Sequence, residues 1–295
     1  MGGKPLFSRS RRTVLQALVA QSTAVAFPRR GRSTDDLPIR IGLTPVFLDD
    51  QIGFLAQWRR WLEHYLARPV RFVQRGSYRE VVELVRAGKI EFAWICGYPY
   101  VRYRTDLQLV AIPVWRGTPT YRSYLIVDRA QPQLRTLDDL RHKVFAYSDP
   151  DSNSGHLYPQ YTLAQKGINP AAFFARTFFT WAHRKVIEAV GVGLAAGGAV
   201  DGYVWETLAE LQPQLVANTK VIEQSPPFGF PPFVTHKHLD LVTFARFRAA
   251  LTKMARDDLG THLLRQLRLD GFTEGDDSLY ASIAEMAAYL ELPRS

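Results

Sequence analysis

The sequence contains a single cysteine, Cys96, among its 295 residues. One cysteine excludes an internal disulfide, so the fold depends on its hydrophobic core even if the protein is exported. Cys96 follows the apolar stretch 92–95, where a cysteine usually serves as a small buried hydrophobe. The alternative is a nucleophile in an enzyme, with His156 or His183 as its base.

Long apolar runs are also scarce. The run at residues 14–27 contains polar residues, among them Gln16 and Gln21, so it is too short and too polar to span a bilayer. Basic residues precede this run, and the sequence Ala-Val-Ala lies near its end at 24–26. These are the three parts of a secretory signal, and a surface amphipathic helix is the alternative.

The basic part of this signal has a specific form. Residues 10–15, Ser-Arg-Arg-Thr-Val-Leu, resemble the twin-arginine signal, with Val14 where Phe is commoner. We therefore expect residues 1–34 to be a signal peptide and linker, recognised by the twin-arginine export machinery. No cysteine directly follows the apolar run, so we expect no lipid anchor and a mature protein free in the periplasm.

Acidic residues are missing from the beginning of the chain. The formal net charge is +9, but seven of the 37 basic residues lie within 1–32, which contains no acid. The other 30 nearly balance the 28 acidic residues. The rest of the chain therefore has no large basic excess, and we expect no nucleic-acid partner.

Motifs of several enzyme classes are absent as well. The sequence shows no metal-ligand spacing, no Gly-x-Ser-x-Gly turn and no lysine-containing phosphate loop. These absences favour a protein that binds a ligand without chemistry. We accordingly predict no catalytic residue, no metal and no cofactor.

Strands and helices are predicted to alternate from residue 39 onward. Stretches rich in β-branched and apolar residues at 39–43, 70–73 and 92–95 predict strands, and the apolar spacing at 52–66 predicts a helix. A second helix begins with the capping box Ser77-Tyr78-Arg79-Glu80 and is closed by Gly88. This alternation predicts a mostly parallel sheet with helices on both faces.

Further strands are predicted after residue 109, and a second α/β unit is predicted to begin with the helix at 136–140. The proline-rich segment 225–234 is interpreted as a stiff crossing without a regular element. The predicted strands are 109–114, 124–127, 143–147, 198–204 and 221–222, and the predicted helices begin or lie at 136–140, 161–166, 183–190, 205–211, 241–257 and 278–290.

The turn that follows the strand 143–147 has the composition of an anion site. Asp151, Ser152, Asn153 and Ser154 are short polar residues that cap helices, and Gly155 lets the backbone approach a ligand closely. The first turn of a helix has free N–H groups and the positive end of the dipole, so an oxyanion can bind there. An ordinary capped loop is the alternative.

Four motifs follow one another along the chain. They are Phe92-Ala93-Trp94 followed by Tyr98-Pro99-Tyr100, residues 148–155 with Pro159, residues 199–206, and Ser225-Pro226-Pro227. In this order they resemble the phosphate/phosphite/phosphonate substrate-binding proteins of ABC transporters, and the resemblance covers about residues 38–275. It implies an α/β fold class, the two-lobed type II periplasmic binding protein fold, with the ligand in the interlobe cleft.

The resemblance also implies how the lobes divide the chain. We expect the first part of lobe 1 at residues 35–123 and lobe 2 at 124–228. We expect the return to lobe 1, with the C-terminal helices, at 229–295.

The resemblance implies a set of ligand-binding residues. Tyr78 and Tyr121 match tyrosines whose hydroxyls would donate to an oxyanion. Ser152, Asn153 and Ser154 match the anion turn, where the family usually has Thr in place of Asn153. His183 matches a histidine that opens the next helix. Packing tyrosines and a surface histidine are the alternatives, and we expect Trp94 and Trp205 in the core.

Asp201 and Tyr203 complete the candidate ligand-binding residues. In relatives that bind aminophosphonates, two acids face the amine, and these positions correspond to Tyr203 and Phe230. Asp201 is then the nearest acid, and an ionised carboxylate can accept the proton of a ligand that still carries an O–H. We therefore expect phosphate, phosphite or a simple alkylphosphonate rather than 2-aminoethylphosphonate.

The resulting hypothesis is an exported solute-binding protein that captures a small phosphorus oxyanion for an ABC transporter permease. Two alternatives stay open. The first is an enzyme on the same fold that uses Cys96 with a histidine. The second is a sensing subunit that presents its closed form to a receptor.

Overall fold

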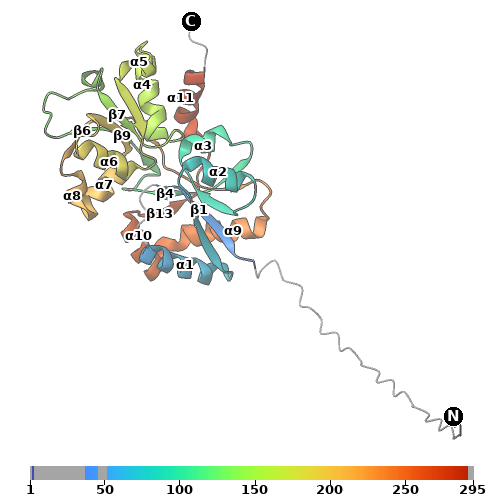
Figure 1. Ribbon diagram of the computed structural model, residues 1–295. Helices are drawn as coiled ribbons and strands as arrows, with labels where there is room; N and C mark the ends of the chain where they lie inside the picture. Colours follow the sequence, from blue (N-terminus) through green and yellow to red (C-terminus); the bar gives the residue numbers. More distant parts are fainter. Residues whose placement is uncertain (1, 3–36, 46–51, 292–295) are drawn as a thin grey trace.

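The computed structural model describes residues 2, 37–45 and 52–291. The expected signal peptide, with Arg11 and Arg12, lies outside the described residues except for Gly2. Figure 1 shows two groups of helices and strands, one around β1 and β4 and the other around β6, β7 and β9. Each group is a lobe built on its own sheet, so the predicted two-lobed α/β fold is confirmed.

Lobe 1 is built on a sheet of six strands in the order β13-β4-β12-β3-β1-β2. β1 runs parallel to β2 and β3, whereas β12 and β13 run antiparallel to β4. The strands are β1 Ile39–Leu43, β2 Val70–Gln74, β3 Phe92–Trp94, β4 Leu107–Val114, β12 Phe233–His236 and β13 Gly271–Thr273. The helices are α1 Ile52–Leu66, α2 Tyr78–Arg86, α3 Gly97–Arg102, α9 Leu241–Lys253 and α10 Asp258–Leu267, with a 3₁₀ turn, η4, at Met254–Arg256.

Lobe 2 is built on a sheet of five strands in the order β10-β6-β9-β7-β8. β7 is parallel to β8 and β9, and β6 is antiparallel to β9 and β10. The strands are β6 Ser123–Asp128, β7 Val144–Tyr147, β8 Arg176–Phe179, β9 Gly197–Asp201 and β10 Thr219–Gln224. The helices are η2 Leu137–Leu140, η3 Asn153–Leu157, α4 Tyr158–Gln165, α5 Pro170–Phe173, α6 His183–Gly191, α7 Gly202–Leu211 and α8 Pro213–Val216.

The two lobes are joined by a small ribbon of two antiparallel strands. β5, Thr120–Tyr121, pairs with β11, Phe228–Gly229. The expected lobe boundaries at residues 123/124 and 228/229 fall within or next to this ribbon. Helix α11, Ala281–Glu291, follows the 3₁₀ turn η5, Asp277–Tyr280, and contacts α3 of lobe 1 and α4 of lobe 2.

The prediction that 225–234 contains no regular element is wrong. β11 and β12 both form there, and β12 lies inside the sheet of lobe 1 between β3 and β4. The prolines precede each strand instead of interrupting it, so the N–H groups of β12 remain free for the ladder. The interpretation of this segment as a crossing holds for β11, which lies in the ribbon.

Other predicted elements need corrections. The helix predicted at 161–166 begins earlier, because a π-helical turn at Asn153–Leu157 leads directly into α4. The strand predicted at 198–204 ends at Asp201, whose side chain caps α7. The helix predicted at 136–140 is a 3₁₀ turn, and β8, α3 and α10 were not predicted.

The capping box predicted at the start of α2 is present. The Ser77 hydroxyl accepts a hydrogen bond from the Glu80 N–H, and the Glu80 carboxylate accepts one from the Ser77 N–H. Two N–H groups at this helix end are thus paired within the chain. The N–H of Tyr78, the first helical residue, remains for a different acceptor.

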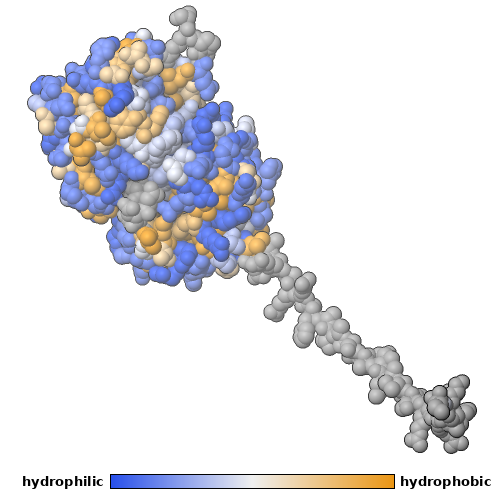
Figure 2. Space-filling view, viewed as in Figure 1, coloured by the Kyte–Doolittle hydropathy of each residue, from blue (hydrophilic) through white to orange (hydrophobic). Residues whose placement is uncertain are grey.

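Aromatic side chains fill the core of lobe 1. Phe92 stacks on Phe247 with ring centroids 3.9 Å apart, and Trp94 stacks on Phe233 at 5.2 Å. In Figure 2 hydrophilic residues cover much of the face in view, with hydrophobic residues in separate patches. Within the described part of the chain, no helix combines the length and apolar character needed to cross a membrane.

Candidate functional site

A cavity of about 30 Å³ lies between the two lobes. Its wall combines the carboxyl ends of β1, β3 and β9 with the first turns of α2, α6 and α7, which is where ligands bind in open α/β sheets. The residues that line it are Leu43, Thr44, Tyr78, Trp94, Cys96, His183, Asp201, Tyr203, Phe230 and Pro231. Among these described lining residues there is no Lys or Arg.

His183 is held in one tautomer at the start of α6. Its Nδ1 accepts a hydrogen bond from the Asp201 backbone N–H at 3.1 Å, so this nitrogen carries no proton. Burial lowers the pKa of His183 to about 3, because the ring is removed from water. The ring is therefore neutral at physiological pH, its proton lies on Nε2, and it offers a donor without charge.

Asp201 is a buried carboxyl group at the end of β9. Its Oδ1 accepts hydrogen bonds from the N–H groups of Tyr203 at 2.8 Å and Val204 at 3.4 Å, so it caps α7. Burial raises the pKa of Asp201 to about 7, and these two N–H groups oppose the rise. It is the one acid among the described residues that line the cavity.

Tyr78 and Tyr121 both keep their protons. Burial raises the pKa of each hydroxyl well above its ordinary value, with the nearby Cys96 as the second cause. Within the described part of the chain, the Tyr78 hydroxyl has no hydrogen-bond partner, and Tyr78 lines the cavity. Tyr121 lies outside the cavity wall and accepts a hydrogen bond from the Asn153 amide at 3.0 Å.

The turn at Ser152–Ser154 lies behind Cys96 rather than in the cavity wall. Ser152 caps the π-helical turn, since its hydroxyl accepts the Gly155 N–H at 3.0 Å. The Asn153 N–H donates to the Cys96 sulfur at 3.3 Å. The Ser154 hydroxyl is buried near Tyr121 and makes no well-aligned hydrogen bond with the described residues. The buried Ser154 hydroxyl therefore keeps hydrogen-bonding capacity close to the cavity but outside its wall.

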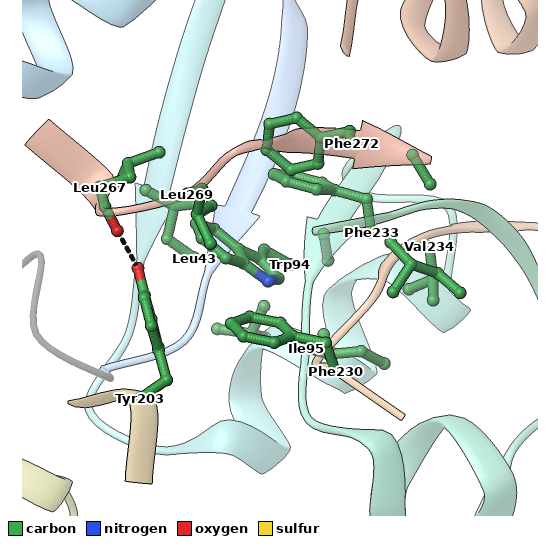
Figure 3. Close-up of a cluster of buried hydrophobic side chains, with 14 of the residues drawn as sticks. Leu43, Trp94, Ile95, Tyr203, Phe230, Phe233, Val234, Leu267, Leu269 and Phe272 are labelled. Atoms are coloured by element: carbon green, nitrogen blue, oxygen red, sulfur yellow. Dashed lines mark hydrogen bonds between the residues drawn. The ribbon is translucent and has the colours of Figure 1, made fainter. Parts of the chain in front are cut away.

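Part of the cavity wall is apolar. Figure 3 shows Tyr203 donating its hydroxyl proton to the Leu267 carbonyl oxygen at 2.6 Å. The Trp94 indole N–H is likewise bonded to the Pro231 carbonyl oxygen at 2.8 Å. These two aromatic residues therefore present ring atoms to the cavity beside Phe230, so Trp94, expected only in the core, also lines the site.

Cys96 lacks the properties of a nucleophile. Its side chain is buried, and burial raises the pKa of the thiol to about 11. No hydrogen bond among the described residues joins its sulfur to either candidate base. His183 Nδ1 is bonded to Asp201, and His156 Nδ1 lies 2.9 Å from the Pro150 carbonyl oxygen. These observations disfavour the enzyme alternative.

Sequence reasoning missed three contributors to the site. Leu43, Thr44 and Pro231 line the cavity, but none belongs to a motif that signals a ligand. It also missed that Asp149 is almost fully buried at the junction of the lobes, with 1% exposure. Asp149 lies within residues 148–155, which the sequence analysis singled out, and this position was the one sequence signal that could have pointed to its role.

Comparisons with known proteins find chains of similar sequence. A family model for the periplasmic substrate-binding proteins of phosphonate ABC transporters matches residues 41–280. The phosphate-import protein PhnD of Mycolicibacterium smegmatis is 27% identical over 161 residues, 52% of this chain and 50% of that protein. The phosphonates-binding periplasmic protein of Escherichia coli is 25% identical over 259 residues, 84% of this chain and 75% of that protein.

Solved structures share the fold. A binding protein component of an ABC phosphonate transporter from Pseudomonas aeruginosa matches with a TM-score of 0.79 and 22% identity, over 86% of this chain and 87% of that one. PhnD1 from Prochlorococcus marinus, solved with methylphosphonate, matches with a TM-score of 0.77 and 18% identity, over 85% and 97%. The match to the mycobacterial relative spans only half of that protein's length.

Proposed function

Because the chain belongs to the family of periplasmic substrate-binding proteins of phosphonate ABC transporters, we propose that it captures a small phosphorus oxyanion between its lobes and delivers it to a membrane permease. The observation that carries this proposal is the cavity lined by neutral donors and one buried acid. Neutral donors suit an anion that has to be released again, since no opposite full charge holds it. We also propose that the protein acts in the periplasm after twin-arginine export.

The donors come from both lobes. Tyr78 of lobe 1 and His183 of lobe 2 each present one polar hydrogen toward the cavity. The turn at Ser152–Ser154 lies behind Cys96, so its hydroxyls would contribute to a ligand that reaches past the Cys96 side chain. A ligand bound to all of these groups favours the closed arrangement, because only that arrangement brings them together.

Asp201 would select a ligand that carries a proton. One of its oxygens is bonded to two N–H groups, and the carboxyl group faces a cavity whose described lining holds no cation. Two negative charges would repel each other there, so the bound pair shares one proton between carboxylate and oxyanion. A phosphorus oxyanion can carry this proton near neutral pH, whereas a sulfonate does not.

The apolar wall would receive the substituent on phosphorus. Trp94, Tyr203 and Phe230 offer carbon atoms, so an ammonium group would lose its hydration without gaining an acceptor on this side. A methyl group would instead be removed from water. We therefore propose a small alkylphosphonate as the preferred ligand, ahead of phosphate and well ahead of 2-aminoethylphosphonate.

A thermal-shift panel with phosphate-free protein tests this proposal. A ligand at about 100 times its Kd adds about 2.7 kcal/mol, which raises the Tm of a chain of this size by about 4–5 °C. We expect the largest shift from methylphosphonate, a smaller one from phosphate and almost none from 2-aminoethylphosphonate or methanesulfonate. A largest shift from the amine or the sulfonate would contradict the proposed ligand class.

A further inference from the structure

We propose that Asp149 is a positioning residue that ties the oxyanion turn of lobe 2 to the first turn of α2 in lobe 1, so that ligand capture and lobe closure depend on the same contact. This inference rests on the proposed function for its link to the ligand. It assigns Asp149 no contact with the ligand itself. The contact joins residues 71 positions apart in the chain.

The hydrogen bond begins at a helix end where a capping box already pairs two N–H groups. At the start of α2 the capping box uses the N–H groups of Ser77 and Glu80. The Tyr78 N–H, at the first helical residue, donates to Asp149 Oδ2 at 3.0 Å. The positive end of the α2 dipole is therefore met by a carboxylate of the protein itself. A ligand oxyanion is left to the donors of the cavity and of lobe 2.

The second oxygen of Asp149 is also engaged. Its Oδ1 accepts the Asp151 N–H at 2.8 Å, and the residue is 1% exposed. Both oxygens thus have N–H partners, one in each lobe, which fixes the carboxylate plane across the junction. Burial and the neighbouring Asp151 charge raise the pKa of Asp149, while the two N–H groups and Arg79 oppose the rise.

Asp151 extends the contact toward solvent. Its carboxylate lies 3.5 Å from Arg79 Nε on α2 and 3.7 Å from Arg102 Nη1 on α3, both in lobe 1. The Asn153 N–H adds a further hydrogen bond between the lobes, to the Cys96 sulfur of lobe 1. All of these contacts are made by residues of the short segment 149–153, which overlaps the proposed oxyanion turn. Opening of the lobes has to break them and release the turn.

The test measures lobe opening and ligand release in Asp149→Asn. The amide keeps the size of the carboxylate but removes its charge, and the isosteric change limits damage to the fold. We expect methylphosphonate to dissociate about tenfold faster in stopped-flow experiments, with an association rate within about twofold of wild type. We also expect a larger radius of gyration of the ligand-free variant in X-ray scattering.

Two further variants complete the design. Asp106→Asn removes an ion pair to Arg86, also on α2 but within lobe 1, and should change neither quantity. The double variant Arg79→Gln, Arg102→Gln removes the two charged contacts to Asp151 between the lobes. Both arginines are exposed, so the fold should tolerate the change, and ligand release should be faster even if Asp149→Asn folds poorly. Unchanged release and scattering in the junction variants would overturn the inference.

The scattering comparison separates this inference from the proposed function. If no phosphorus compound binds the wild-type protein, the ligand assignment fails. The ligand-free radius of gyration still reports whether Asp149 joins the lobes. If methylphosphonate binds but the Asp149 variant releases it at the wild-type rate and stays equally compact, the inference alone is wrong.

Discussion

At the scale of single residues, two serines in one turn make different contacts. The Ser152 hydroxyl caps the π-helical turn through the Gly155 N–H, whereas the Ser154 hydroxyl is buried and makes no well-aligned hydrogen bond to a described residue. Loss of a cap costs about 0.5–2 kcal/mol of stability. The two alanine variants should therefore differ in stability even if both weaken binding.

Ser154→Ala is expected to lower the affinity for methylphosphonate about tenfold, because a hydrogen bond to a charged oxygen is worth about 1.5–3 kcal/mol. Its Tm should stay near that of the wild type. Ser152→Ala should lower both affinity and Tm. Calorimetric titration and thermal denaturation measure the two effects, and wild-type affinity in Ser154→Ala would move the oxyanion away from this turn.

The pKa of Asp201, raised by burial to about 7, gives binding a pH dependence. When the pH is below this pKa, either the Asp201 carboxyl group or the ligand carries the proton that the two share in the complex. When the pH is above it, Asp201 and the ligand are both ionised before they meet. Binding then has to take up a proton from solution, so the affinity falls by up to tenfold per pH unit. Asn at this position does not ionise, so Asp201→Asn should show a weaker dependence between pH 7 and 9.

Calorimetry in two buffers with different ionisation enthalpies measures this proton directly. At pH 9 the wild-type protein should take up close to one proton from the buffer for each ligand bound. This number is reduced by the fraction of ligand that is already protonated at that pH. Parallel pH profiles for wild type and Asp201→Asn would show that Asp201 holds no shared proton.

At the scale of elements, the π-helical turn at Asn153–Leu157 depends on a glycine at its middle position. A Cβ built on Gly155 would lie 1.9 Å from the Ser148 hydroxyl oxygen, 2.8 Å from the Ser148 Cβ and 3.1 Å from His183 Cε1. The turn therefore approaches β7 and α6 more closely than any other residue allows. This close approach places Gly155 directly against the His183 ring.

Gly155→Ala is expected to destabilise the protein by about 1–3 kcal/mol, because the turn has to move away from Ser148. The same shift should lower ligand affinity. Gly53→Ala is the matched control, since a Cβ there meets nothing within 4 Å and Gly53 lies in α1. Chemical denaturation should find that control equal to or slightly more stable than wild type.

At the scale of the whole molecule, export is still a prediction, because the expected signal lies outside the described residues. The absence of internal disulfides suits a protein that folds before it is exported. If the twin-arginine machinery carries it, changing Arg11 and Arg12 together to Lys should stop release of the folded mature protein into the periplasm. Cell fractionation measures this, and an unchanged periplasmic yield would point to general secretion instead.

The sequence by itself determined the elements whose signals are local. The capping box at Ser77 and the apolar spacing of 52–66 predicted helices whose starts agree with α2 and α1. The order of the motifs was enough to predict the two-lobed fold and the family. Such signals depend on neighbouring residues, so a single chain carries them in full.

Only the tertiary structure decided how distant residues meet. The position of β12 inside the sheet of lobe 1 depends on β3 and β4, more than 100 residues away, and no local pattern encodes that pairing. The same holds for the tautomer of His183, fixed by the Asp201 N–H, and for Asp149 at the end of α2. These features arise from tertiary contacts within and between the lobes, which set burial and hydrogen-bond partners independently of the neighbouring residues in the chain.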